Sequence, residues 1–243
     1  MTPATHTVNT PDGIRVVFDQ YAGDRSHVLV MCHGFFQSRS TRDFQQMARV
    51  FAQQTDVVSL DFRGHGDSSG WYTFSAKEDA ELHSVLAWAK AQYARAIVMG
   101  FSMGGAIAMN TVDAHRPFVT GLVAVSAPAA FEDVEFKFWT PEAIRTGWES
   151  LGAGVGCRPG NPFLPKQRPV ESVARLSGLP LLFIHGTKDV IVGVEHSRRL
   201  FAAASEPKQL SIIEGGGHAE VLFRRDPEGF VRLVNDWMGG DHA

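Results

Sequence analysis

Seven short apolar runs, spread along the chain, most constrain how this sequence can fold. They are rich in valine, isoleucine and leucine, and they are IRVVF from 14, VLVMC from 28, VVSL from 57, AIVMG from 96, GLVAVS from 121, LLFIH from 181 and LSIIE from 210. Apolar runs without alternating polar residues are typical of strands covered on both faces, as in a parallel sheet.

Helical patterns separate most of these runs. One helix is expected after Ser75, which forms a predicted capping box with Glu78. Its apolar positions then recur at helical spacing: Leu82, Val85, Leu86, Ala89 and Tyr93. Others are expected near 42–53, 103–115, 195–204 and 227–238. Strands alternating with helices predict an α/β fold with a doubly wound, mostly parallel sheet, and the PDG at 11–13 predicts a hairpin at its edge.

The 243 residues suit one domain spanning 1–243, interrupted by one unusual stretch. From about Ala127 to Gly178 there is no clear strand, and proline, glycine and aromatic residues are frequent. We interpret 127–178 as a small cap or lid inserted over the strand ends. A disordered linker is the alternative, but the aromatic residues favour packing. They include Phe131, Phe136, Phe138, Trp139, Trp148 and Phe163.

Charge and composition indicate few kinds of partner. The formal net charge is -3 and no block of like charges occurs, so we expect no nucleic-acid partner. The N-terminal MTPATHTVNTPDG lacks a signal-peptide pattern, and no apolar run approaches the ~18 residues of a membrane span, so a cytoplasmic protein is expected. Cys32 and Cys157 are interpreted as buried or idle thiols, with a disulfide as the alternative and no zinc or other metal site.

The segment GFSMGG at 100–105 lies where an apolar run becomes a helix. Its G-x-S-x-G pattern predicts a strained strand-to-helix turn that presents Ser102 as a nucleophile. The alternative is an ordinary tight turn that happens to contain a serine. Glycines two positions either side are expected because those neighbours approach the serine Cβ. The next helix points its N-terminus at the serine, where an oxyanion would form.

A serine hydroxyl needs a general base, and a histidine base needs an orienting carboxylate. His218 follows the last apolar run in a glycine-rich loop, and Asp189 follows the run LLFIH. In a parallel sheet both would lie at the same edge as Ser102. The alternatives are an incidental histidine in a helix turn and a solvated aspartate, or one paired with Lys188. The oxyanion donors are expected to be the amides of Phe35 and Met103.

The sequence resembles the α/β-hydrolase superfamily, and within it the small serine esterases and monoacylglycerol-lipase-like hydrolases. The resemblance rests on HGF at 33–35, DFRGHGDSSG at 61–70, GFSMGG at 100–105, HGTKD at 185–189 and GGGHAE at 215–220. It implies that Ser102 is the nucleophile, His218 the base and Asp189 the acid, with Phe35 and Met103 as oxyanion donors. The chain order Ser…Asp…His agrees with this family. No cofactor is implied.

Other residues remain as alternatives to this set. DFRGHGDSSG is interpreted as structural, with His33, Arg63 and His65 holding backbone carbonyls. In some relatives an acid after the sixth strand replaces the usual one, and here the nearest are Glu132 and Asp133. Asp189 remains the better candidate.

The resemblance implies cleavage of carboxylic esters, of small or medium acyl or aromatic groups, through an acyl-enzyme. Trp71, Tyr72 and Phe74 suggest an apolar pocket, or else they seal the cap onto the core. The same triad serves thioesterases, aminopeptidases, perhydrolases and C–C bond hydrolases, and a ligand receptor on this scaffold is a further alternative. An acidic patch would favour a peptidase: Glu132, Asp133, Glu135, Glu142 and Glu149. A small-molecule ester is the expected partner. The oligomeric state is open, and a homodimer is one of the options.

Overall fold

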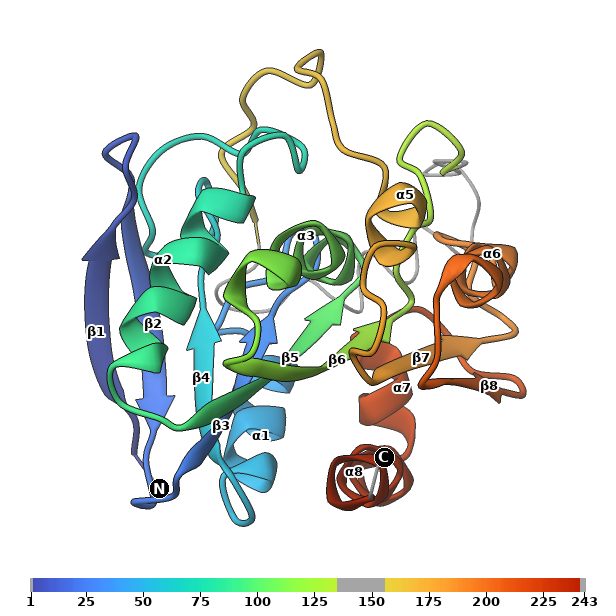
Figure 1. The fold of residues 1–243 in the computed structure, drawn as a ribbon. Helices are drawn as coiled ribbons and strands as arrows, with labels where there is room; N and C mark the ends of the chain where they lie inside the picture. The colour runs from blue at the N-terminus through green and yellow to red at the C-terminus, as the bar shows by residue number, and fades with distance from the viewer. Residues whose placement is uncertain (1, 135–155, 241–243) are drawn as a thin grey trace.

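The computed structural model describes residues 2–134 and 156–240. One sheet of eight strands, in the order β1-β2-β4-β3-β5-β6-β7-β8, crosses the molecule (Figure 1). The strands are β1 (Ala4–Asn9), β2 (Arg15–Tyr21), β3 (His27–Cys32), β4 (Asp56–Leu60), β5 (Arg95–Phe101), β6 (Val119–Val125), β7 (Leu181–Gly186) and β8 (Lys208–Ile213). All seven apolar runs form strands, so the predicted α/β fold with a mostly parallel sheet is confirmed.

The first two strands form the predicted hairpin at one edge. β1 pairs with β2 and β2 with β4 in antiparallel fashion, whereas every pair from β4–β3 onward is parallel. Phe101 at the end of β5 pairs with Val125 of β6, and Val125 pairs with Ile184 of β7. The carboxyl ends of the central strands therefore lie at one level along one edge of the sheet.

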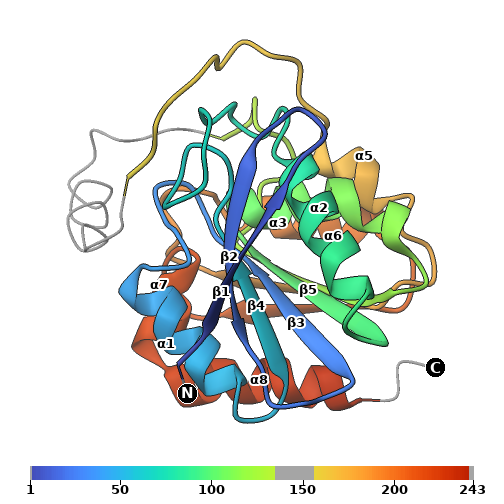
Figure 2. The ribbon, with the colours of Figure 1, turned by 90° about the vertical axis from the view of Figure 1, so that its left-hand side faces the viewer.

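Two layers of helices cover the sheet, and Figure 2 shows them on opposite faces. One layer holds α2 (Asp79–Lys90), α3 (Met103–Thr111) with the 3-10 turn η1 (Val112–His115), α5 (Pro169–Val173) and α6 (Glu195–Ala203). The other holds α1 (Arg42–Phe51), α7 (Glu220–Arg225) and α8 (Pro227–Gly239). Each layer encloses its own apolar core, around Leu86 and Ile107 on one face and around Phe44 and Phe230 on the other.

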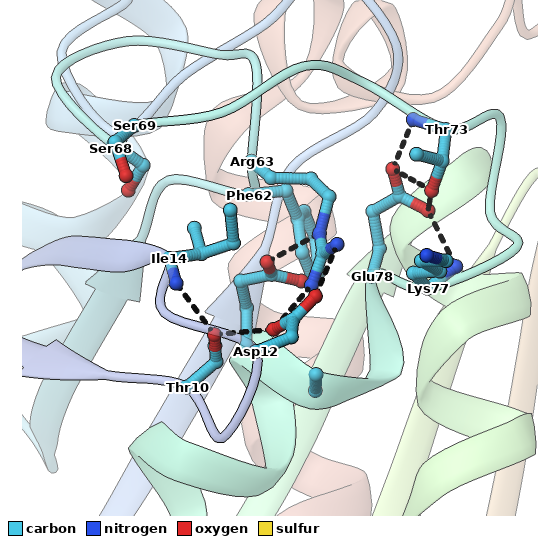
Figure 3. A network of polar contacts seen from close by, with 12 residues as sticks. Thr10, Asp12, Ile14, Phe62, Arg63, Ser68, Ser69, Thr73, Lys77 and Glu78 are labelled. Atoms are coloured by element: carbon cyan, nitrogen blue, oxygen red, sulfur yellow. Dashed lines mark hydrogen bonds and ion pairs between the residues drawn. The ribbon is translucent and has the colours of Figure 1, made fainter. Parts of the chain in front are cut away.

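The predicted capping box of α2 is wrong. Ser75 has a φ of 69° and does not cap the helix, which begins at Asp79. The Glu78 carboxylate instead accepts hydrogen bonds from the Thr73 amide (2.6 Å) and the Thr73 hydroxyl (3.0 Å), as Figure 3 shows. The amide and hydroxyl of Thr73 thus occupy the Glu78 carboxylate, which a capping box would have used to bind the Ser75 amide.

The described part of 127–178 contains the short helix α5, which the sequence did not predict. Four of the aromatic residues on which the predicted cap rests lie outside the described residues: Phe136, Phe138, Trp139 and Trp148. Phe163 is described and is 91% exposed, so it does not pack as expected. The cap stays a prediction.

Among the described residues, no helix is long and apolar enough to cross a membrane. The two cysteines are free thiols: Cys32 is buried and Cys157 is half-buried. The disulfide left open by the sequence is therefore not formed. The described residues also contain no group of three or more histidine, cysteine or acidic side chains that could hold a metal ion.

Candidate active site

Ser102 lies at the turn between β5 and α3, in a strained backbone conformation. Its φ of 51° and ψ of −116° belong to a region that residues with a Cβ seldom adopt. Such strain costs on the order of 1–3 kcal/mol and persists only where the surroundings enforce it. The Ser102 amide, which donates to the Val125 carbonyl of β6 at 2.8 Å, is one of the contacts that hold the turn.

The flanking glycines are required for a different reason from the one predicted. A Cβ on Gly100 would lie 2.4 Å from the Gly104 carbonyl oxygen, and one on Gly104 would lie 2.4 Å from the Cys32 carbonyl oxygen. The close neighbours are thus backbone atoms of α3 and β3 and not the serine Cβ. Glycine lets the helix start against the ends of the strands and so brings its N-terminus to Ser102.

His218 and Asp189 are in direct contact, as the sequence predicted for two residues at neighbouring strand ends. His218 Nδ1 donates to Asp189 Oδ2 at 2.7 Å. Asp189 is not paired with Lys188. Its Oδ1 accepts from the amides of Ile191 (3.0 Å) and Val192 (2.9 Å), so the carboxylate is fixed from both sides.

A second histidine, His185, lies behind the carboxylate and is fully buried. Its Nε2 donates to the Val192 carbonyl at 2.8 Å and is 3.2 Å from Asp189 Oδ2, while its Nδ1 accepts from the Ser197 hydroxyl at 2.6 Å. Burial would raise the pKa of Asp189, but the charge of His218 and the hydrogen bonds from both histidines lower it below its usual range. Asp189 is therefore a stable anion.

The environment of His218 favours its protonated form. Burial opposes the imidazolium, but the charge and hydrogen bond of Asp189 and the charge of Glu220 outweigh it and raise the pKa of His218. A histidine whose imidazolium is stabilised in place can accept a proton during a reaction.

The chain around His218 is anchored next to the serine turn. The Ala219 amide donates to the Ser126 hydroxyl at 3.0 Å, and Ser126 directly follows Val125, the residue that accepts from the Ser102 amide. The serine turn and the His218 loop are thus both hydrogen-bonded to the carboxyl end of β6, the first through Val125 and the second through Ser126. Within the described residues Ser102 Oγ makes no hydrogen bond, and such bonds in unliganded enzymes often shorten only when substrate binds.

The loop after β3 packs against the serine. A Cβ on Gly34 would lie 3.3 Å from the Phe101 carbonyl oxygen and 3.4 Å from Ser102 Cβ. The Phe35 amide donates no hydrogen bond to any described residue, and the Met103 amide, at the first position of α3, has no carbonyl of its own helix to bind. Within the described residues neither amide has a hydrogen-bond partner. One follows Gly34, which packs on Ser102, and the other follows Ser102 at the positive end of α3.

Buried polar contacts hold this loop in place. His33 Nδ1 donates to the Gly34 carbonyl at 2.7 Å, and His33 Nε2 accepts from the Phe62 amide at 3.1 Å. The amide and the guanidinium of Arg39 both bind the Asp61 carboxylate, at 2.7 and 2.6 Å. Burial first, and then the proximity of His65, lower the pKa of His33 well below its usual range, so it stays neutral and keeps these roles.

The predicted contacts with backbone carbonyls are confirmed for His33 and His65, whereas Arg63 has a structural role but different partners. His65 Nδ1 donates to the Arg63 carbonyl at 3.1 Å. Arg63 itself holds carboxylates and not carbonyls: it binds Asp12 in the β1–β2 turn (2.8 Å), as Figure 3 shows, and Glu81 on α2 (2.6 Å). A buried guanidinium pairs preferentially with carboxylates.

A model of the alpha/beta hydrolase family matches residues 29–233, which include every residue of this site. The chain is a member of the alpha/beta hydrolase family.

Among curated proteins, this α/β hydrolase resembles the uncharacterized protein Rv2307c of Mycobacterium tuberculosis, with 29% identity over 91% of this chain and 72% of the relative. Among solved structures it resembles the esterase RhEst1 from Rhodococcus sp. ECU1013, with a TM-score of 0.79, 24% identity and 99% of both chains covered. The Pyrococcus furiosus esterase Pf2001 also has a TM-score of 0.79, at 18% identity over 99% of this chain and 93% of that one. These similarities confirm the fold.

The other carboxylates considered for this α/β hydrolase are engaged elsewhere. Glu132 pairs with Arg168 and Asp133 with Arg199, each at 2.7 Å. Neither carboxylate contacts His218. Glu135, Glu142 and Glu149, the rest of the predicted acidic patch, lie outside the described residues.

Sequence reasoning missed three side chains of this site: Ser126, His185 and Glu220. Each adjoins or belongs to a quoted motif, since GLVAVS ends at Ser126 and the blocks HGTKD and GGGHAE contain the other two. Their roles depend on which residue they contact across the sheet edge. Sequence position could have marked them as neighbours of the site. It could not show that Ser126 binds Ala219, that His185 lies against Asp189, or that Glu220 accepts a hydrogen bond from the Gln37 side chain at 3.0 Å.

Proposed function

We propose that this protein is a serine hydrolase that cleaves carboxylic esters through an acyl-enzyme. The observation that carries the proposal is the Asp189–His218 pair, held by the Ser126–Ala219 hydrogen bond at the strand end that also holds the strained Ser102. A serine beside an anchored histidine–carboxylate pair is the arrangement that makes a hydroxyl nucleophilic.

The mechanism follows from the positions of these groups. The ester carbonyl oxygen would face the amides of Phe35 and Met103, and Ser102 Oγ would attack the carbonyl carbon as His218 takes its proton. The tetrahedral oxyanion is stabilised by the two amides. His218 then protonates the leaving alcohol, and water cleaves the acyl-enzyme with His218 again as base. Asp189 keeps the histidine oriented and favours its imidazolium.

The aromatic residues beside the oxyanion loop support an apolar or aromatic acyl group. Phe35 lies 5.1 Å from Tyr72 and 6.2 Å from Phe74, measured between ring centroids. Because Phe35 is also the expected oxyanion donor, this apolar surface begins next to the reacting carbonyl. Tyr72 is 4% exposed and its amide donates to the Arg158 carbonyl at 2.8 Å, so it also seals residues near 158 onto the body of the protein.

Replacement of the serine tests the proposal. We expect Ser102→Ala to fold normally, to lose hydrolysis of short p-nitrophenyl esters and to lose labelling by a fluorophosphonate. Ser84→Ala is the matched control, because the Ser84 hydroxyl binds only a carbonyl of its own helix, at 2.8 Å from Ala80 O. A series of acyl chains on oxygen and thioester leaving groups then defines the substrate.

Substantial ester hydrolysis by pure Ser102→Ala protein would refute the serine mechanism. Tight ligand binding by the wild type with negligible turnover of every ester and thioester would instead support the receptor alternative.

A further inference from the structure

One buried hydrogen bond joins the oxyanion loop to the loop that carries His218. Gln37 Nε2 donates to Glu220 Oε1 at 3.0 Å, between residues that are 183 positions apart. Both residues are only 5% exposed. The proposed mechanism uses neither side chain, yet Gln37 lies two residues after Phe35 and Glu220 two residues after His218.

The Glu220 carboxylate lacks the strong partner that a buried charge normally has. Burial raises the pKa of Glu220. The charge of His218 opposes this rise most, followed by a backbone hydrogen bond and the charge of Arg224, while the charge of Asp43 adds to the rise. Arg224 is itself engaged by Asp43, to which its Nε donates at 2.9 Å. The charge that most favours ionised Glu220 is therefore the imidazolium of His218, which also faces Asp189.

The residue between His218 and Glu220 is strained. Ala219 has a φ of 47° and a ψ of −116°, nearly the same unusual conformation as Ser102. Such a conformation persists only when its neighbours enforce it. Here three successive residues each have an anchor: His218 binds Asp189, the Ala219 amide binds Ser126, and Glu220 binds Gln37. Glu220 is the anchor that reaches the oxyanion loop.

We propose that Glu220 is a positioning residue that, through Gln37, sets the oxyanion loop against the His218 loop and places a second carboxylate beside the imidazolium. The inference rests on the ester hydrolysis proposed above. As Ser102 attacks, the oxyanion forms at the Phe35 amide at the same time as His218 becomes positively charged. The Gln37–Glu220 hydrogen bond, here called the bridge, connects the two loops that hold these charges. Because both charges develop only in the transition state, we expect loss of the bridge to lower kcat more than it changes KM.

Two substitutions separate the bridge from the charge. Gln37→Met removes the donor at similar size, and we expect a fall in kcat of about 10- to 100-fold with little change in KM, because small misplacements at a reacting centre are costly. Glu220→Gln keeps an oxygen that can accept from Gln37 but removes the charge. Without that charge the pKa of His218 falls, so the acid limb of kcat/KM moves to lower pH.

The experiment measures kcat, KM and the pH profile of p-nitrophenyl butyrate hydrolysis for wild type, both variants and the double variant. The matched control is Glu214→Gln, which removes an exposed carboxylate four residues before His218 and is expected to change neither kcat nor the acid limb. Because Glu220→Gln keeps the acceptor for Gln37 and removes only the charge, the losses in the double variant are expected to equal the product of the single losses. Far-UV circular dichroism and thermal unfolding establish that each variant is folded.

Two results would overturn the inference while the proposed function stands: a Glu220→Gln acid limb that superimposes on the wild type, or an unchanged kcat in Gln37→Met. If Glu220→Gln does not fold, Gln37→Met alone tests the inference, and an unchanged kcat in that variant overturns it. Absence of Ser102-dependent ester hydrolysis in the wild type would instead refute the proposed function.

Discussion

At the scale of single residues, the chemistry depends on how neighbouring charges act on His218 and Asp189. Burial alone would make both groups neutral, because a charged side chain loses hydration in the interior. Contact between them reverses this outcome: the pKa of His218 is raised and that of Asp189 is lowered. Asp189 therefore stabilises the imidazolium that forms when neutral His218 takes a proton from a third group, which we propose to be Ser102.

The raised pKa of His218 predicts a pH dependence. The base must be neutral to accept the serine proton, so activity falls as the pH decreases through the pKa of His218. Because that pKa is raised, we expect the acid limb of kcat/KM for a p-nitrophenyl ester to lie above the ordinary histidine value of about 6.5. A limb at or below that value would contradict the assignment of His218 as the base in this environment.

Asp189→Asn removes the negative charge that orients and stabilises the base. We expect kcat to fall about 10⁴-fold, as when the carboxylate of a serine–histidine triad is neutralised, with little change in thermal stability. The measurement is kcat at a pH above the acid limb. Retention of more than a tenth of wild-type kcat would show that another group orients His218. Asp133→Asn is the control, because Asp133 pairs with Arg199 and not with a histidine.

At the scale of secondary-structure elements, buried arginines join segments that are distant in sequence. Arg39 ties the oxyanion loop to the loop after β4 through Asp61. Arg63, on that same loop, ties it to the β1–β2 turn and to α2 through Asp12 and Glu81, and Figure 3 shows it between these segments. Each arginine therefore holds several segments at the carboxyl ends of the strands in fixed positions relative to one another.

Arg63→Met tests this role. It leaves the fully buried Glu81 carboxylate without its partner, and breaking a buried pair costs about 3–5 kcal/mol of unfolding free energy. Burial already raises the pKa of Glu81 to about 8 against the favourable charge of Arg63, and without Arg63 it would rise further. The folded wild type keeps Glu81 protonated up to about pH 8, so the loss should grow only above that pH, where the wild type ionises Glu81 beside Arg63 while the variant must keep it protonated.

Urea unfolding at about pH 7 and about pH 9.5 measures the Arg63→Met effect. Asp12→Asn is the comparison, because the Asp12 side chain is 44% exposed and its pairing with Arg63 is worth only about 0–1 kcal/mol. Equal losses for the two variants, or a loss for Arg63→Met that does not change with pH, would show that the Arg63–Glu81 contact is not what holds these elements.

At the scale of the whole molecule, the C-terminal helix supports the back of the serine turn. Phe230 on α8 is 2% exposed, and its ring centroid lies 6.2 Å from that of Phe101, the residue before Ser102. On the opposite face of the sheet α3 begins at Met103 and packs into the other core. The turn is thus clamped between two apolar layers, one on each face of the sheet.

Phe230→Ala should lower the free energy of unfolding by about 3–5 kcal/mol, because it opens a cavity in a closely packed core. Urea unfolding followed by tryptophan fluorescence measures the change. The same substitution at Phe163, which is 91% exposed, is expected to alter stability by less than about 0.5 kcal/mol. Similar losses at the two positions would argue against this account of the core.

Local patterns predicted what depends on local physics. The seven apolar runs form strands because both faces of a parallel sheet are covered, and the helices near 42–53, 103–115, 195–204 and 227–238 form where their apolar period indicated. The helix α7 was missed because six residues are too few to display a helical period. The Ser75 capping box was wrong because Thr73 offered Glu78 a competing pair of donors.

The sequence alone determined that Ser102, Asp189 and His218 each follow a strand, because apolar runs and glycine turns are patterns of a few neighbouring residues. That the carboxyl ends of those strands share one edge followed from the parallel topology. Only the tertiary structure decided which side chains meet there: Ser126 with Ala219, His185 with Asp189, and Gln37 with Glu220. Such contacts depend on strand register and on the angles at which loops leave the sheet, and these are set by packing of the whole molecule and not by any one segment.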